Sequence, residues 1–343
     1  SANHGDVVYG RASATNAASP MPQTSAYSSN ATATIPKWIT PLLQNSWTNY
    51  GSPYQSAAYT KTSDGLVVLK GMIKKVTGTP AGEVIATLPV GYRPSDNLMF
   101  GTSTNSNVSG RIDVRSNGDV IAVSASASWL SLESIRFMPA GTPHTRVTPA
   151  LVKRWTSYGG VTPAAYTYDN NGRVVVQGVV APGTITNGTR IFDLPANRLP
   201  YLYQHIATRS TAHSHVGVDN RAGGTGVLAK GVGSTYLSLS ILFLGSSSGA
   251  SWTNLSLVNG WVWYSDSGGI FSTPQYTKTT DGLVVLKGLI RSGSTTYDSV
   301  IATLPAGYRP SERILTTTAN SANYSRIDIL ANGEIHFMGA DNG

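Results

Sequence analysis

Cysteine is absent from this chain of 343 residues, which excludes disulfide bonds and thiolate metal sites. Charged residues are scarce, at 12 % of the sequence, while apolar residues make up 40 %. That balance is not typical of a disordered chain. No apolar run approaches the roughly 20 residues that a membrane-spanning helix needs. We therefore expect a soluble protein that buries apolar side chains and does not insert into a membrane.

Basic residues give the chain a net charge of +8, but they are dispersed along the sequence. Only Lys74-Lys75 and Lys153-Arg154 are adjacent pairs. Proteins that bind nucleic acid usually concentrate such charge on one face, so we expect no nucleic-acid partner. A dispersed positive excess instead favours approach to an anionic surface.

What the chain does contain is an internal repeat of about 107 residues. Trp47, Trp155 and Trp261 open the same pattern in three copies, and a turn dipeptide followed by an apolar run comes after each tryptophan. The first and third runs, 60–73 and 277–290, are identical at twelve of fourteen positions. Short β-branched and leucine runs bounded by Asp-Gly or Asn-Gly turns predict strands joined in hairpins.

Two further blocks recur after this run. Ile85 to Pro89 with Gly91-Tyr92-Arg93-Pro94 returns as Ile301 to Pro305 with Gly307 to Pro310, and copy two departs from it. The prolines predict a rigid loop that ends a strand, because proline fixes φ and cannot donate to a β ladder. The third block is Arg-Ile-Asp-Val followed by Asn117-Gly118, repeated before Asn332-Gly333, and it predicts a second hairpin with an Arg–Asp ion pair on one strand face.

These patterns predict an all-β protein built from tandem β-sandwich modules of jelly-roll type. We place module 1 at 36–143, module 2 at 144–249 and module 3 at 250–343, after a low-complexity attachment arm or linker at 1–35. A closing strand follows the second hairpin in copies one and two, around Trp129-Leu130-Ser131-Leu132 and Tyr236-Leu237-Ser238-Leu239. Module 3 ends before this strand. Either the chain continues or was cleaved, which we favour, or a neighbouring subunit supplies the strand.

Chemistry-bearing residues form few constellations. The sequence contains no nucleophile elbow, phosphate loop or zinc signature, so we expect no enzyme. His213 and His215 are peculiar to copy two and would lie on the same side of an extended strand. In a threefold-symmetric assembly such a pair near the axis could present six nitrogens to one transition metal. We favour the other interpretation, a polar loop with solvated histidines and no cofactor.

Aromatic residues divide into recurring and copy-specific sets. Five recur and are expected in the core or in subunit contacts, namely Trp47, Trp155, Trp261, Trp129 and Tyr236. Aromatics in loops can stack on sugar rings or anchor a partner, since they offer large area at low entropic cost. The candidates for ligand binding, with ordinary packing as the alternative, are Tyr201, Tyr203, Trp263, Tyr264 and Phe271.

The order of blocks resembles modules of bacteriophage tail fibres and minor tail proteins, of the type found in phages of Gram-positive and actinobacterial hosts. The blocks are Leu-Val-Val-Leu-Lys-Gly, Ile-Ala-Thr-Leu-Pro with Gly-Tyr-Arg-Pro, Arg-Ile-Asp and Trp-Leu-Ser-Leu, from residue 36 onward. The resemblance implies a virion structural protein, a homotrimeric fibre or tail tip that binds host cell-surface polysaccharide. It also implies contact with other virion proteins through the arm.

Three functional hypotheses follow from these patterns. The first is a virion fibre that binds host glycan. The second is a purely structural virion component, such as a head fibre, decoration or spacer. The third is a fibre that degrades polysaccharide, which would need two facing carboxylates that the sequence gives no sign of.

Overall fold

The computed structural model is all-β, which confirms the predicted fold class. It describes residues 7–10, 31–34 and 37–340, with gaps at 64, 106–108, 169–172, 184–187, 197–198, 200–203, 211–212, 222–223, 231–234, 245–250, 265–270, 280 and 321–322. Every strand pair within its sheets is antiparallel. Among the described residues, no helix is long and apolar enough to cross a membrane.

Module 1 contains three small sheets, and its strands follow one another closely along the chain. A four-stranded sheet has the order β7-β10-β9-β8, and two three-stranded sheets have the orders β12-β5-β4 and β11-β6-β3. The strands are β3 (Trp47–Asn49), β4 (Ala58–Lys61), β5 (Val67–Lys70), β6 (Met72–Lys75), β7 (Glu83–Thr87), β8 (Leu98–Ser103), β9 (Ser109–Val114), β10 (Asp119–Ser124), β11 (Leu130–Ser131) and β12 (Arg136–Phe137).

Module 2 repeats this arrangement with sheets β17-β20-β19-β18, β14-β15-β22 and β13-β16-β21. Its strands are β13 (Thr156–Ser157), β14 (Ala165–Tyr168), β15 (Arg173–Gln177), β16 (Val179–Ala181), β17 (Thr189–Asp193), β18 (Gln204–Arg209), β19 (His213–Arg221), β20 (Gly224–Lys230), β21 (Leu237–Ser238) and β22 (Ile241–Leu244).

Module 3 has the four-stranded sheet β28-β31-β30-β29, the sheet β23-β25-β26 and the pair β24-β27. Its strands are β23 (Thr253–Asn254), β24 (Val262–Trp263), β25 (Gln275–Lys278), β26 (Val284–Lys287), β27 (Ile290–Arg291), β28 (Ser299–Thr303), β29 (Ile314–Asn320), β30 (Asn323–Ile329) and β31 (Glu334–Ala340). The arm contributes one hairpin-like pair, β1 (Val7–Gly10) with β2 (Ala31–Thr34).

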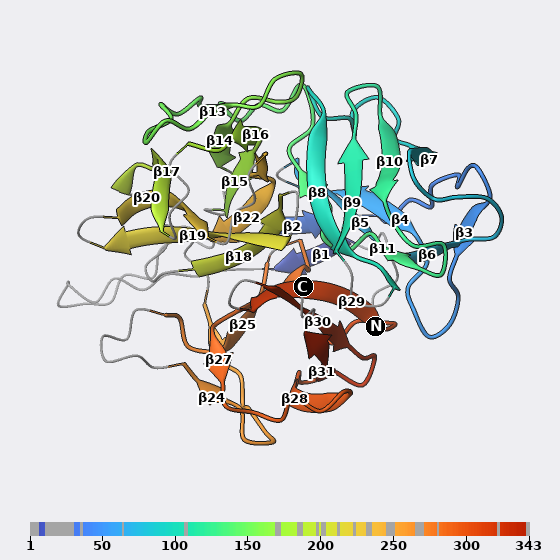
Figure 1. Cartoon of the computed structure of the whole chain (residues 1–343). Helices are drawn as coiled ribbons and strands as arrows, with labels where there is room; N and C mark the ends of the chain where they lie inside the picture. The colour runs from blue at the N-terminus through green and yellow to red at the C-terminus, as the bar shows by residue number, and fades with distance from the viewer. Residues whose placement is uncertain are drawn as a thin grey trace, which may run out of the picture.

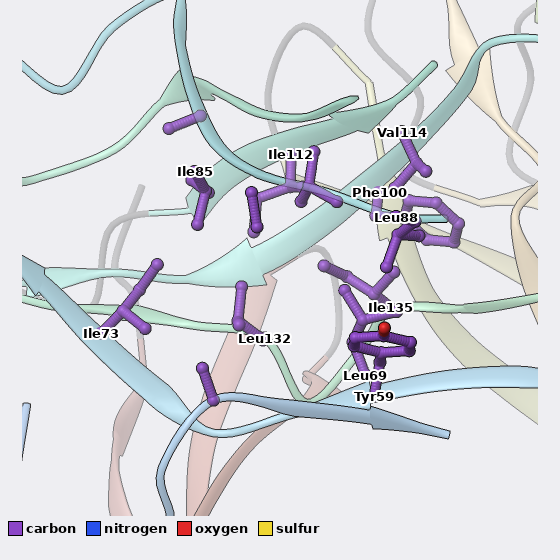
Figure 2. Close-up of a cluster of buried hydrophobic side chains, with 14 of the residues drawn as sticks. Tyr59, Leu69, Ile73, Ile85, Leu88, Phe100, Ile112, Val114, Leu132 and Ile135 are labelled. Carbon is purple, nitrogen blue, oxygen red and sulfur yellow. The ribbon is translucent and has the colours of Figure 1, made fainter. Parts of the chain in front are cut away.

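Each module has its own core between its sheets. In module 1 the core draws on every strand from β3 to β12, and Figure 2 shows Leu132 and Ile135, on either side of the turn between β11 and β12, among side chains of the facing sheets. The corresponding cores of modules 2 and 3 are separate clusters. Trp47 and Trp155, 2 % and 3 % exposed, lie in these cores, as the sequence predicted.

The recurring loop of Gly-Tyr-Arg-Pro is fixed by the same contacts in modules 1 and 3. Arg93 Nε donates to the Leu88 carbonyl at 2.8 Å, and Arg309 Nε donates to the Leu304 carbonyl at 2.9 Å. In module 1 the Tyr92 ring meets the Tyr59 ring edge-on, with centroids 5.1 Å apart. This loop is therefore part of the scaffold.

The expected single closing strand is divided into two. In module 1, β11 pairs with β6 and β12 pairs with β5. The reason is Gly71, which separates β5 from β6 at a φ of +108° and turns the chain between them. We call residues 129–137 and 236–244, which contain β11–β12 and β21–β22, the closing segments of modules 1 and 2.

Figure 1 shows the three modules side by side around one centre: module 1 in blue to cyan, module 2 in green to yellow and module 3 in orange to red. The three equivalent edge strands, β8, β18 and β29, contact one another pairwise at this centre. The threefold arrangement expected between subunits thus occurs within one chain. A homotrimer of this chain stays a prediction.

Candidate functional site

Side-chain hydrogen bonds join neighbouring modules. The closing-segment serine of module 1, Ser131, donates from Oγ to the Leu315 carbonyl of module 3 at 2.9 Å. The equivalent serine of module 2, Ser238, donates to the Met99 carbonyl of module 1 at 2.7 Å. Met99 and Leu315 are equivalent positions, opposite Asp113 and Asp328 in the sheets. Each closing segment therefore also contacts the next module around the centre.

The Arg–Asp pairs predicted from the Arg-Ile-Asp block are present. Arg111 Nη2 lies 2.7 Å from Asp113 Oδ2, and Arg326 Nη2 lies 2.7 Å from Asp328 Oδ2. Each guanidinium also lies over an aromatic ring of a neighbouring module's closing segment. Arg111 Cζ is 5.5 Å from the ring centre of Tyr236. The sequence predicted the ion pairs but not this cation–π contact, because strand periodicity carries no information about which module lies opposite.

Arg326 makes the equivalent contact with Trp129, at 5.0 Å from the ring centre. Trp129 and Tyr236 were expected in the core or in subunit contacts, and both are buried, each in an aromatic cluster that joins two modules. The carboxylate of Asp328 is fully buried and also accepts from Arg313 Nε at 2.7 Å. Arg111 and Arg326 therefore act in the scaffold.

A buried ion pair joins all three modules. Arg173 Nη2 of module 2 lies 3.4 Å from Asp281 Oδ2 of module 3, and their side chains are 2 % and 1 % exposed. Ser63 of module 1 donates from its hydroxyl and its backbone N–H to Oδ1 of the same carboxylate. The sequence assigned Asp281 to a turn alone. The sequence does contain one sign of this ion pair, because Arg173 occupies the position at which copies one and three have Leu66 and Leu283.

One histidine lies between two carboxylates in module 3. His336 Nδ1 is 2.9 Å from Asp298 Oδ1, and Nε2 is 3.2 Å from Glu334 Oε2. A hydrogen bond from the Asn332 amide, and a second from His336, lower the pKa of Glu334. Both ring nitrogens face carboxylates, so neither is directed at an open space where a substrate could bind. The group ties β28 to β31.

The candidate metal ligands lie in β19 of module 2. His215 pairs with Ala207 and His213 pairs with Arg209 across the β18–β19 ladder. The structure describes their backbone only. Among the side chains that it does describe, no group of three histidine, aspartate or glutamate residues could hold a metal ion. A metal at His213 and His215 stays a prediction.

The candidate aromatics are in two places. Tyr201 and Tyr203 lie outside the described residues. Trp263 ends β24, and its Nε1 donates to the Phe271 carbonyl at 3.3 Å. Tyr264 and Phe271 meet edge-on, with ring centroids 5.5 Å apart, and Arg291 lies over the Tyr264 ring at 5.3 Å. The structure therefore brings Trp263, Tyr264 and Phe271 together.

Tyr264 and Phe271 have equivalents in module 1, which the sequence comparison missed. Tyr50 and Tyr54 meet edge-on at 5.4 Å in the same way, and they pack against Trp129 and Leu315 at the module interface. The available signal was spacing, since Tyr50 and Tyr264 each lie three residues after the tryptophan that opens the repeat. In module 3 the equivalent surface is open, and Tyr264 is 37 % exposed.

One partly buried acid is peculiar to module 1. Glu133 lies between β11 and β12, and its Oε1 accepts from the Gly71 N–H at 2.9 Å. Burial raises the pKa of Glu133 to about 7, although the hydrogen bond from Gly71 and the nearby Lys70 and Arg136 act in the opposite direction. Module 2 has Ser240 at the equivalent position.

This raised pKa predicts a pH-dependent stability. A carboxyl that is easier to protonate in the folded state stabilises folding most below its unfolded pKa, near 4.5, and that contribution is lost as the pH rises to about 7. Relative to that of Glu133→Gln, the free energy of unfolding of the parent should fall by up to about 3 kcal/mol between pH 4.5 and 7.5. Denaturant titrations across this range test it, with the exposed Glu312→Gln as control. Parallel pH profiles of the parent and Glu133→Gln would contradict it.

Comparison with known proteins yields no relative: no family model, no curated protein and no solved structure matches the chain.

Proposed function

We propose that this chain is a non-catalytic structural protein of a bacteriophage particle, a tail fibre or tail tip component that binds host cell-surface glycan. The proposal rests on where the recurring sequence blocks lie in the structure. The residues through which the sequence resembles tail fibre modules occupy hairpins, the Arg93 loop and the contacts between modules, including Trp129 and Ser131. Their roles are all structural.

Glycan binding is supported by charge and by exposed aromatic surface. The chain carries a net charge of +8, which favours approach to an anionic cell wall. Trp263, Tyr264 and Phe271 form an aromatic group at the edge of module 3, with the Arg291 guanidinium beside it. Aromatic faces with a neighbouring cation suit sugar rings that bear phosphate or carboxylate groups.

Binding of the purified chain to cell-wall glycan tests this proposal. We expect saturable binding to walls of a susceptible host at 0.15 M salt, weaker binding after removal of anionic polymers, and at least fivefold weaker binding for Trp263→Ala. Trp38→Ala is the matched control, since Trp38 lies in module 1 with Lys70 over its ring. Absence of binding to any host wall, with the folded chain confirmed on the particle, would contradict glycan recognition.

A purely structural role is the second candidate. It is favoured by the equivalence of Tyr264 and Phe271 to Tyr50 and Tyr54, which pack between modules. Antibody labelling of the chain on intact particles separates the two candidates. A spacer would have other proteins beyond it, whereas a receptor-binding component would lie at the distal end.

A further inference from the structure

Modules 1 and 2 each end with a closing segment that joins two sheets. In module 1, β11 extends the sheet edge of β6 and β12 extends the edge of β5. The Leu132 N–H donates to the Gly71 carbonyl at 2.9 Å, and the Leu69 N–H donates to the Ile135 carbonyl at 3.0 Å. In module 2, β21 and β22 make the same additions to β16 and β15.

Module 3 offers the same two edges without such a segment. Within the described part of the chain, β26 pairs with β25 alone and β27 pairs with β24 alone. Gly288 separates β26 from β27 at a φ of +128°, as Gly71 separates β5 from β6. We call the free sides of β26 and β27 the acceptor edge. Open backbone donors and acceptors of this kind are ready to pair with an added strand.

Apolar side chains along the acceptor edge are exposed where their equivalents are buried. Leu286 of β26 is 37 % exposed, whereas Leu69 is 4 % exposed and Val176 is fully buried. Ile290 of β27 is partly exposed, whereas the equivalent Ile73 is fully buried. The sequence of this run is nearly identical in modules 1 and 3, so the difference arises from the missing cover.

The aromatic part of the interface is also formed in advance. Tyr50 and Tyr54 of module 1 and Tyr158 of module 2 pack against a closing-segment aromatic, Trp129 or Tyr236. In module 3, Tyr264 and Phe271 keep the edge-on geometry seen in module 1. No described residue supplies the aromatic ring that a closing segment would place against Tyr264.

Module 2 presents equivalent backbone groups to the serine of such a segment. Ser131 donates to the carbonyl of Leu315, and Ser238 donates to that of Met99. By sheet register the third equivalent is the carbonyl of His205, opposite Gly217. Thr102 and Thr208 donate to the carbonyls of the two serines, and Thr318 is their equivalent in β29.

We propose that the acceptor edge of module 3 binds a strand pair with the closing-segment pattern of an aromatic residue, Leu-Ser-Leu and a later Phe. The aromatic ring would lie against Tyr264, the two leucines would cover Leu286 and Ile290, and the serine hydroxyl would reach the His205 carbonyl. The edge is open to an incoming strand, because Leu286 is exposed where its equivalents Leu69 and Val176 are covered. The strand pair and the proposed glycan would both cover Tyr264, so the two proposals compete for that ring, and peptide binding is measured without glycan to test this inference on its own.

A labelled peptide with the sequence of residues 127–138 tests the proposal with the intact chain. We expect saturable binding at one peptide per chain, measured by fluorescence anisotropy, and slowed hydrogen exchange in β26 and β27. Changing Leu130 and Leu132 of the peptide to aspartate should abolish binding. Changing Ser131 of the peptide to alanine should weaken binding about fivefold, as expected for one lost hydrogen bond.

Chain variants locate the site. Leu286→Asp should weaken peptide binding at least tenfold at an unchanged melting temperature, because Leu286 is already exposed. The matched control is Leu42→Asp, at a position 83 % exposed in module 1, and it should bind as the parent does. Equal binding by Leu286→Asp, or slowed exchange in β5 and β6 instead, would overturn the proposal.

Discussion

Arg173→Leu is expected to lower the free energy of unfolding by about 3–5 kcal/mol, although it restores the leucine of the other two copies. The substitution leaves the Asp281 carboxylate buried at the junction of the modules, with only Ser63 still donating to it among the contacts described above. Removing one partner of a buried pair is far more costly than removing both, because a charge remains without compensation.

The double variant Arg173→Leu with Asp281→Asn distinguishes this cause from lost packing. Neutralising Asp281 should recover at least half of the loss, giving a coupling energy of about 2 kcal/mol in the double-mutant cycle. The control is Arg190→Ala, whose pair with Asp193 is exposed and should cost less than about 1 kcal/mol. Calorimetry is the suitable measurement, since three modules can unfold in steps. Additive effects of the two substitutions would contradict the assigned role.

Gly71→Ala, in module 1, is expected to lower the free energy of unfolding by about 3 kcal/mol or more. At a φ of +108° an added Cβ would lie 2.5 Å from the Ser56 carbonyl oxygen and 2.6 Å from Ala57 Cα. Backbone cannot yield as a flexible side chain does, so the β5–β6 junction would have to shift. The same close approach occurs at Gly178 and Gly288, and this explains why a glycine ends the run in every copy.

Gly91→Ala is the matched control for this prediction. Gly91 also has a positive φ, +88°, but an added Cβ would have nothing within 4 Å. It should cost about 1 kcal/mol, the strain of the backbone conformation alone. The free energy of unfolding of both variants, measured by denaturant titration with tryptophan fluorescence, gives the comparison. Equal costs would show that close packing at Gly71 contributes nothing.

Local features of the fold could be predicted from the sequence because they depend on a few adjacent residues. The turn at Asn117-Gly118 places Gly118 at a φ of +96° and joins β9 to β10, as hairpin chemistry requires. The ion pair of Arg111 with Asp113 followed from the alternation of side chains along a strand. These inferences needed no knowledge of what lies across the module boundary.

Features that depend on contacts between modules could not be predicted. Trp129 and Tyr236 have the pattern of core residues, and only the packed structure separates a module's interior from its interface. Asp281 had a sufficient local explanation in its turn, which concealed its long-range pair with Arg173. Tyr264 and Phe271 were assigned to a loop because residues inserted between them hide their equivalence to Tyr50 and Tyr54.

Linking three modules in one chain around a common centre changes how the assembly responds to dilution. Separate subunits must meet by diffusion, so a threefold assembly of them dissociates as concentration falls. Here Ser131, Ser238 and the pair of Arg173 with Asp281 join modules of the same chain, at an effective concentration set by the connecting segments. The module interfaces should therefore persist in a single molecule, and each copy can diverge in sequence without changing its two neighbours.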